Sequence, residues 1–143
     1  MPMTAEDTIT IVLADDHAVV RSSLRHLLDA EPDFVVVGEA SDVDAALRSV
    51  AGFKPSVLIL DLNMPGGRPS LEAIPSVAGV SSGTRVVVLT VHEDPEFAHH
   101  ALRAGALGYV VKDAAHGELV EAVRRVAAGE RYVNPRLGAP PTD

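Results

Sequence analysis

Five residues with phosphate and metal chemistry follow short apolar runs of this sequence: Asp15, Asp16, Asp61, Thr90 and Lys112. Carboxylates, a hydroxyl and an ammonium group gathered in one crevice could support phosphoryl transfer to a carboxylate. A hard cation and the lysine would neutralise charge on the phosphoryl oxygens while the carboxylate attacks in line. The product of this chemistry is an acyl phosphate, a known form of covalent catalysis by aspartate.

The three aspartates predict a cation at the same place. Carboxylates that share a crevice repel one another, and their pKa values rise unless a cation joins them. Mg2+ (or Mn2+) is the natural candidate, because it prefers oxygen ligands and keeps water positions for a phosphate. Each of these residues also has an ordinary structural explanation when it is considered alone. Each aspartate could form a turn or cap a helix, Thr90 could be a packing residue, and Lys112 could be a solvated charge. We favour the site because these separate explanations do not account for the whole set.

An alternation of apolar runs and helical segments positions these residues. Runs rich in β-branched residues predict strands over 9–14, 34–38, 57–60, 85–89 and 108–111. Apolar spacing and capping residues predict helices over 17–30, 42–52, 70–79, 95–104 and 115–128.

This alternation predicts an α/β fold with a doubly wound parallel sheet and right-handed crossovers. Strands that are apolar throughout indicate that helices cover both faces of the sheet. The pattern leaves the strand order open, and 2-1-3-4-5 is one of two common orders. Ligands bind such sheets at the carboxyl ends of the strands, where the five residues stand.

Composition and charge exclude several classes of protein. The chain has 143 residues, 47% of them apolar, which fits one globular domain. Its net charge of −8 and scattered arginines argue against nucleic-acid binding by this segment. It has no cysteine, and no apolar run approaches the roughly 20 residues that span a bilayer. We expect a soluble, cytoplasmic domain with no membrane partner.

The ends of the chain differ from its centre. We expect residues 1–8 to be a disordered N-terminus without the pattern of a signal peptide, and residues 9–131 to form the domain. Residues 132–143 contain Pro135, Gly138, Pro140 and Pro141, a composition typical of a linker.

Four segments in this order resemble the receiver domain of two-component response regulators over residues 9–131. They are Val12–His17, Leu60–Gly66, Val88–Thr90 and Gly108–Asp113. In detail the chain resembles the NarL/FixJ (LuxR-type) subfamily, in which Asp-His follows the first strand and Lys-Asp closes the fifth. The resemblance implies a flavodoxin-like (βα)5 fold with strand order 2-1-3-4-5.

The resemblance also implies roles for the acidic residues and the lysine. Asp61 is the expected phosphoacceptor, with Lys112 paired to the phosphoryl oxygens. Asp16 and Asp61 are expected to bind Mg2+ together with the backbone carbonyl of Asn63, and Asp15 is expected to reach the ion through water.

Further residues are expected to respond to the phosphate. Thr90 is expected to swing its hydroxyl towards the phosphoryl group, and Tyr109 to turn inward behind it as the switch aromatic. Asn63 and His92, each two residues after a site residue, would flank the path of hydrolytic water and tune dephosphorylation. A solvated loop histidine is the alternative for His92.

The partners that the resemblance implies are a sensor histidine kinase and a second copy of the chain. The kinase would dock near the first helix, over 17–30, and a homodimer would form through the first and last helices upon phosphorylation. DNA would be contacted only by a LuxR-type C-terminal domain absent from this sequence, and a stand-alone receiver is the second possibility. The domain is not expected to be an enzyme beyond its own phosphotransfer and dephosphorylation.

Two other functions compete with this interpretation. A phosphatase of the haloacid-dehalogenase type would also use Asp61 as a nucleophile, but needs a second aspartate two residues later as acid and base. Asn63 occupies that position and cannot transfer protons. A degenerate receiver that acts only as an interaction module is the other alternative, and the complete set of five residues argues against it.

Overall fold

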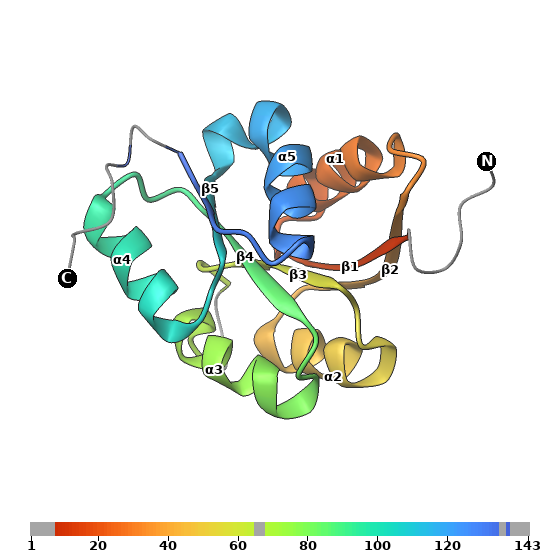
Figure 1. Ribbon diagram of the computed structural model, residues 1–143, viewed down its shortest axis with the longest axis horizontal. Coiled ribbons are helices and arrows are strands. Elements are labelled where there is room, and N and C mark those ends of the chain that lie inside the picture. The colour runs from red at the N-terminus through yellow and green to blue at the C-terminus, as the bar shows by residue number, and fades with distance from the viewer. Residues whose placement is uncertain (1–7, 65–67, 135–136, 138–143) are drawn as a thin grey trace.

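The computed structural model of the chain describes residues 8–64, 68–134 and 137 (Figure 1). The predicted disordered N-terminus falls outside this part of the chain apart from Thr8, as do residues 138–143 of the predicted linker. Within the described residues, no helix is both long and apolar enough to cross a membrane.

The core of the fold is one sheet of parallel strands in the order β2-β1-β3-β4-β5-β6. The strands are β1 (Ile9–Ala14), β2 (Phe34–Ala40), β3 (Val57–Asp61), β4 (Arg85–Thr90), β5 (Gly108–Val111) and β6 (Tyr132–Val133). The helices are α1 (Ala18–Asp29), α2 (Val43–Phe53), α3 (Ser70–Val80), α4 (Pro95–Ala104) and α5 (Ala115–Ala127), with a 3-10 turn, η2 (Lys112–Ala114), before α5. The predicted α/β class and the order 2-1-3-4-5 are confirmed.

The short strand β6 is an element that the sequence did not predict. It lies in the segment assigned to the linker and pairs with β5, with Tyr109 opposite Val133. Leu137 follows and is only 7% exposed. A strand of two residues is too short to show the alternation of apolar and polar residues by which strands are recognised. The prolines and glycine that follow therefore led to the prediction of a linker.

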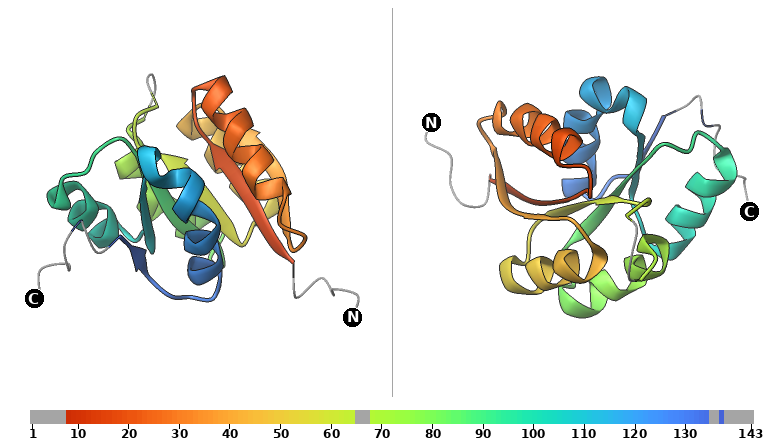
Figure 2. Two further views of the ribbon diagram at one scale, coloured as in Figure 1. Left: turned by 90° about the horizontal axis from the view of Figure 1, so that it is seen from above. Right: turned by 180° about the vertical axis from the view of Figure 1, so that it is seen from behind.

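Helices cover both faces of the sheet (Figures 1 and 2). α1 and α5 lie on one face, and α2, α3 and α4 lie on the other. Successive residues of a strand point to opposite faces, and β1 follows this rule. Ile11 and Leu13 pack in the core under α1 and α5, whereas Val12 and Ala14 pack in the core on the side of α2 and α3.

Capping residues fix where two helices begin. The side chain of Asp42 accepts a hydrogen bond from the N–H of Ala45 at 2.8 Å, and that of Asp94 accepts one from Glu96 at 2.9 Å. These contacts satisfy N–H groups that have no partner within the first turn of a helix. Asp42 and Asp94 are therefore the N-caps of α2 and α4, and the second sets the start of α4 directly after the loop that leaves β4.

Gly108 is the position where α5 packs most closely on the sheet. A Cβ atom there would lie 3.0 Å from Cγ2 of Val87 and 3.0 Å from Cγ2 of Val126. Both valines are fully buried, and β-branched side chains have little rotamer freedom with which to move aside. Only glycine therefore fits without displacing α5.

We predict that Gly108→Ala lowers the free energy of unfolding by about 1–3 kcal/mol, the usual penalty for overpacking a core. Urea unfolding followed by circular dichroism measures this change. Gly117→Ala in α5 is the matched control, because a Cβ there meets nothing within 4 Å. The control should leave stability unchanged or raise it by up to about 1 kcal/mol. Equal stability of Gly108→Ala and the wild type would contradict the predicted packing.

Candidate functional site

Parallel strands bring the chemically active residues to one edge of the sheet. Asp15 follows β1, Asp61 is the last residue of β3 and Thr90 the last of β4. Lys112 follows β5, whose last residue, Val111, pairs with Thr90. These residues are far apart in sequence and meet because neighbouring strands point the same way.

Lys112 holds two fully buried carboxylates at this edge. Its Nζ lies 3.1 Å from Oδ2 of Asp61, in a hydrogen bond, and 3.2 Å from Oδ2 of Asp15, in an ion pair without hydrogen-bond geometry. The other oxygen of each aspartate accepts a backbone N–H two residues later. Asn63 donates to Asp61 Oδ1 at 2.9 Å, and His17 donates to Asp15 Oδ1 at 2.8 Å. The turns therefore orient both carboxylates towards the lysine.

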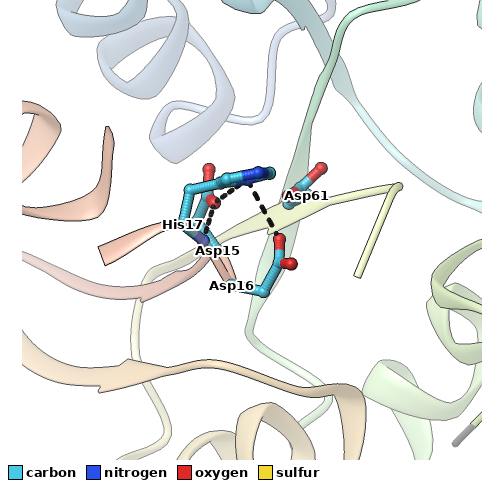
Figure 3. Close-up of side chains that lie close together, drawn as sticks. All are labelled: Asp15, Asp16, His17 and Asp61. Atoms are coloured by element: carbon cyan, nitrogen blue, oxygen red, sulfur yellow. Dashed lines mark hydrogen bonds and ion pairs between the residues drawn. The ribbon is translucent and has the colours of Figure 1, made fainter. Parts of the chain in front are cut away.

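The acidic cluster offers a set of oxygens that fits a hard cation. Ligand atoms of Asp15, Asp16, His17 and Asp61 all lie within 4.8 Å of one another (Figure 3). Asp16 Oδ1 and Asp15 Oδ2 are buried and have no hydrogen-bond partner. Buried polar atoms without partners are uncommon, and an ion is one of their ordinary explanations. Three carboxylates against one lysine also leave negative charge to be compensated, so the donor set fits Mg2+ or Mn2+.

His17 belongs to this cluster, although the sequence assigned it no role. Its Nδ1 lies 3.3 Å from Asp16 Oδ1 and 3.6 Å from Asp15 Oδ1, while the side chain is 63% exposed. Figure 3 shows the ring beside the carboxylates of Asp15 and Asp16. The Asp-His dipeptide after the first strand was visible as a subfamily feature, but adjacency in sequence does not tell which way the ring points.

Burial sets the protonation behaviour of the central pair. It raises the pKa of Asp61, and the charge of Asp15 acts in the same direction. The N–H of Asn63 and the ammonium of Lys112 oppose this shift without cancelling it. For Lys112, burial favours the neutral amine, but hydrogen bonding and charge from Asp61 and Asp15 outweigh it, and its pKa is raised. Lys112 is therefore charged at neutral pH, whereas ionised Asp61 is held at an energetic penalty.

Thr90 and Tyr109 meet at the backbone of His92. Thr90 is buried, and its Oγ1 accepts a hydrogen bond from the N–H of His92 at 3.2 Å. The hydroxyl of Tyr109 donates to the carbonyl of His92 at 2.9 Å. Tyr109 is fully buried, which raises its pKa to about 12. The aromatic side chain points inward, and its role as the switch aromatic stays a prediction.

The ring of His92 packs against α4. It stacks on the ring of Phe97, with centroids 4.1 Å apart and planes 7° from parallel. His92 is thus a packed residue with a defined contact and differs from the solvated loop histidine considered above. A role for His92 and Asn63 in dephosphorylation stays a prediction, as does a role for the carbonyl of Asn63 in cation binding.

Similar proteins are response regulators and their receiver domains. A LuxR-family response regulator from Aurantimonas sp. SI85-9A1 is 35% identical, with a TM-score of 0.85 over 91% of this chain and 92% of that one. The receiver domain of NarL from Mycobacterium tuberculosis is 33% identical, with a TM-score of 0.81 over 87% and 99%. The oxygen regulatory protein NreC of Staphylococcus carnosus is 40% identical over 127 residues, 89% of this chain and 58% of NreC. The chain therefore spans somewhat more than half the length of this curated relative.

The raised pKa of Asp61 gives a prediction about stability and pH. A carboxyl with a raised pKa in the folded state stabilises the fold below its ordinary pKa, and this contribution is lost as the pH rises through the raised value. We therefore predict that Asp61→Asn, in metal-free buffer, has a higher free energy of unfolding than the wild type at pH 7. The difference should shrink as the pH falls below about 4, where Asp61 is protonated in both states.

Urea unfolding across this pH range in the presence of a chelator tests the prediction. Glu130→Gln is the control, because Glu130 is an exposed charge in the loop after α5. A lower stability of Asp61→Asn at pH 7 would show that the pairing with Lys112 outweighs burial and repulsion.

The family model described as "Response regulator receiver domain" matches residues 11–124, most of the chain. The match includes the acidic cluster, Thr90 and Lys112, together with the sheet that positions them. Its fold and the similar proteins named above agree with this family. The chain therefore belongs to the response regulator receiver domains and is a phosphoacceptor signalling domain of the NarL/LuxR family.

Proposed function

We propose that Asp61 is the phosphoacceptor and receives a phosphoryl group from a sensor histidine kinase. A carboxylate oxygen of Asp61 attacks the phosphorus, a new O–P bond forms, and the bond from phosphorus to the donor nitrogen breaks. The donor histidine keeps the electron pair of that bond. The observation that carries this proposal is the contact of Lys112 with buried Asp61, which favours the ionised form of the acceptor and orients it at the edge of the sheet.

The acidic cluster is the proposed site of Mg2+ or Mn2+. Asp16 and Asp61 would bind the ion with the carbonyl of Asn63, and Asp15 would reach it through water. The buried oxygens Asp15 Oδ2 and Asp16 Oδ1, which accept no hydrogen bond, support this assignment. When bound, the cation supplies charge neutralisation for the transferring phosphoryl group. Lys112 compensates the charge on the opposite side and holds the acceptor in place.

Thr90 and Tyr109 form the proposed switch. The Thr90 hydroxyl is engaged with the backbone of His92, one residue beyond the level of Asp61 in the sheet. A phosphoryl group on Asp61 would compete for this hydroxyl, because charged oxygens are stronger acceptors. Thr90 would then release the N–H of His92, and the loop to which the buried Tyr109 also donates would rearrange. Phosphorylation thus biases an equilibrium between two arrangements of the loop after β4.

The kinase has a surface beside the acceptor on which it could dock. A cleft of about 480 Å3 lies between α1 and α5, next to Lys112. Its lining includes Val19 and Val91, whose side chains are 83% and 57% exposed. Large apolar side chains at such exposure mark surfaces that bind other proteins. We propose that the kinase docks here, close enough for its phosphohistidine to reach Asp61.

The output of the domain is proposed to be transcription control. A homodimer through α1 and α5 would form on phosphorylation, and a LuxR-type domain outside this sequence would bind DNA, with residues after β6 as linker. RcsB of this fold, 26% identical to the chain, has been solved as two dimers bound to two parallel DNAs. A stand-alone receiver that acts by protein contact is the second candidate. The net charge of −8 is unsuited to direct DNA binding by this segment, which agrees with both candidates.

We predict that the chain gains one phosphoryl group when it is mixed with Mg2+ and acetyl phosphate, as measured by intact mass. Asp61→Ala should gain none. Asp44→Asn, which changes an exposed carboxylate on α2, should be phosphorylated like the wild type. A wild type that neither gains mass nor binds beryllofluoride would refute phosphorylation at Asp61. Steady release of p-nitrophenol from p-nitrophenyl phosphate would instead support the phosphatase alternative.

We also predict that His92→Glu shortens the lifetime of the phosphoprotein severalfold without moving the phosphorylation site. The substitution removes the stack on Phe97 and places a carboxylate in the loop near the acceptor, where it can orient hydrolytic water. Decay of the phosphorylated mass after removal of acetyl phosphate measures the lifetime. His100→Glu, an exposed position on α4, is the control. An unchanged lifetime in His92→Glu would remove this role.

A further inference from the structure

Arg21 of α1 contacts the backbone of the acidic turn rather than its carboxylates. Its Nη1 donates a hydrogen bond to the carbonyl oxygen of Asp15 at 2.6 Å, and its Nε donates to Oε1 of Glu39 at 2.8 Å. Glu39 lies near the end of β2, so the guanidinium joins this edge strand to the turn after β1. Arginine suits this bridge, because its planar fork donates in two fixed directions at once.

The carbonyl that Arg21 holds belongs to the peptide bond between Asp15 and Asp16. Two further contacts fix the same turn: the N–H of Asp15 donates to the carbonyl of Ala40 at 3.0 Å, and the N–H of His17 donates to Asp15 Oδ1 at 2.8 Å. The contact with the carbonyl restrains the peptide plane that leads into Asp16, and with it the position of the Asp16 Cα. Asp16 Oδ1 is thereby presented to the cluster although it has no hydrogen-bond partner of its own.

We propose that Arg21, held by Glu39, is the positioning residue of the cation site. This inference rests on the proposed function of Asp16 as a ligand. Its physical basis is that a cation gains most from carboxylates that are already fixed, because no conformational freedom is then lost on binding. Lys112 cannot do this work, since it contacts carboxylate oxygens that face the same crevice. Arg21 fixes the turn while leaving the carboxylate oxygens available.

The expected consequence is a loss of cation affinity with little loss of maximal rate. Outer contacts that orient metal ligands typically change metal affinity by about 10- to 100-fold, and we expect the lower value because Arg21 acts through the backbone and not on a ligand oxygen. Because Arg21 does not contact Asp61, phosphorylation at saturating Mg2+ should proceed close to the wild-type rate. A general structural defect would lower the rate at every Mg2+ concentration.

The test compares Arg21→Met with Arg25→Met in the 143-residue chain. Arg25 lies one helical turn further along α1 and donates to Oε2 of the same Glu39 at 2.5 Å, so it is a control for the loss of an ion pair with Glu39, together with a pair to Asp29 at 3.5 Å. Mg2+ is titrated against the melting temperature, which reports binding without phosphorylation. The initial rate with acetyl phosphate is then measured across the same Mg2+ range.

About tenfold weaker Mg2+ binding in Arg21→Met, with a nearly normal rate at saturation and unchanged affinity in Arg25→Met, would support the proposal. Equal Mg2+ affinity in wild type and Arg21→Met, or equal losses in both variants, would overturn it. If Arg21→Met does not fold, Arg21→Lys serves instead, since lysine keeps the charge near Glu39 but lacks the planar fork. Wild-type Mg2+ affinity in Arg21→Lys would then overturn the proposal. A wild type that shows no Mg2+ response would instead refute the proposed cation site itself.

Discussion

Three carboxylates and one ammonium group share a buried edge of the sheet, and this imbalance of charge governs the site. Lys112 lies between Asp15 and Asp61, both fully buried, and can compensate only part of their charge. Removing charged groups from water is unfavourable unless partners replace the lost hydration. Backbone N–H groups of His17 and Asn63 replace some of it. The negative charge that remains uncompensated favours the binding of a cation, as proposed above.

The rest of the fold keeps this unfavourable cluster together. Two apolar cores, one on each face, fix the strands whose ends carry the charged residues. Close packing at Gly108 holds the last turn of α5, at Val126, against the sheet. A protein core resists small displacements because it is packed as densely as an organic crystal. The stability that the two apolar cores contribute can therefore offset the repulsion between carboxylates at the edge of the sheet. Functional sites commonly tolerate local destabilisation in this way.

Sequence patterns predicted the parts of the structure that depend on local periodicity and on the direction of strands. Apolar runs located β1 and β3, and the parallel direction of their ends brought Asp15 and Asp61 together. The strand order followed from the resemblance to receiver domains, because crossover rules alone allow more than one order. The contacts that escaped prediction depend on side-chain direction or on distant partners. Arg21 binds Glu39, which is 18 residues away in the sequence, and no sequence pattern predicts that the two residues pair.

Strand β5 connects the charge cluster to the end of the described chain. Lys112 follows this strand, Tyr109 lies within it, and Val133 of β6 pairs with Tyr109. Tyr109 faces the core beside α4 and donates to the backbone of His92, the residue that also engages Thr90. If a change at Asp61 released Thr90, it would therefore alter a hydrogen-bonded loop to which Tyr109 is attached. Because β6 is hydrogen-bonded to β5, it lies beside the strand that contains Tyr109 and ends directly before Lys112.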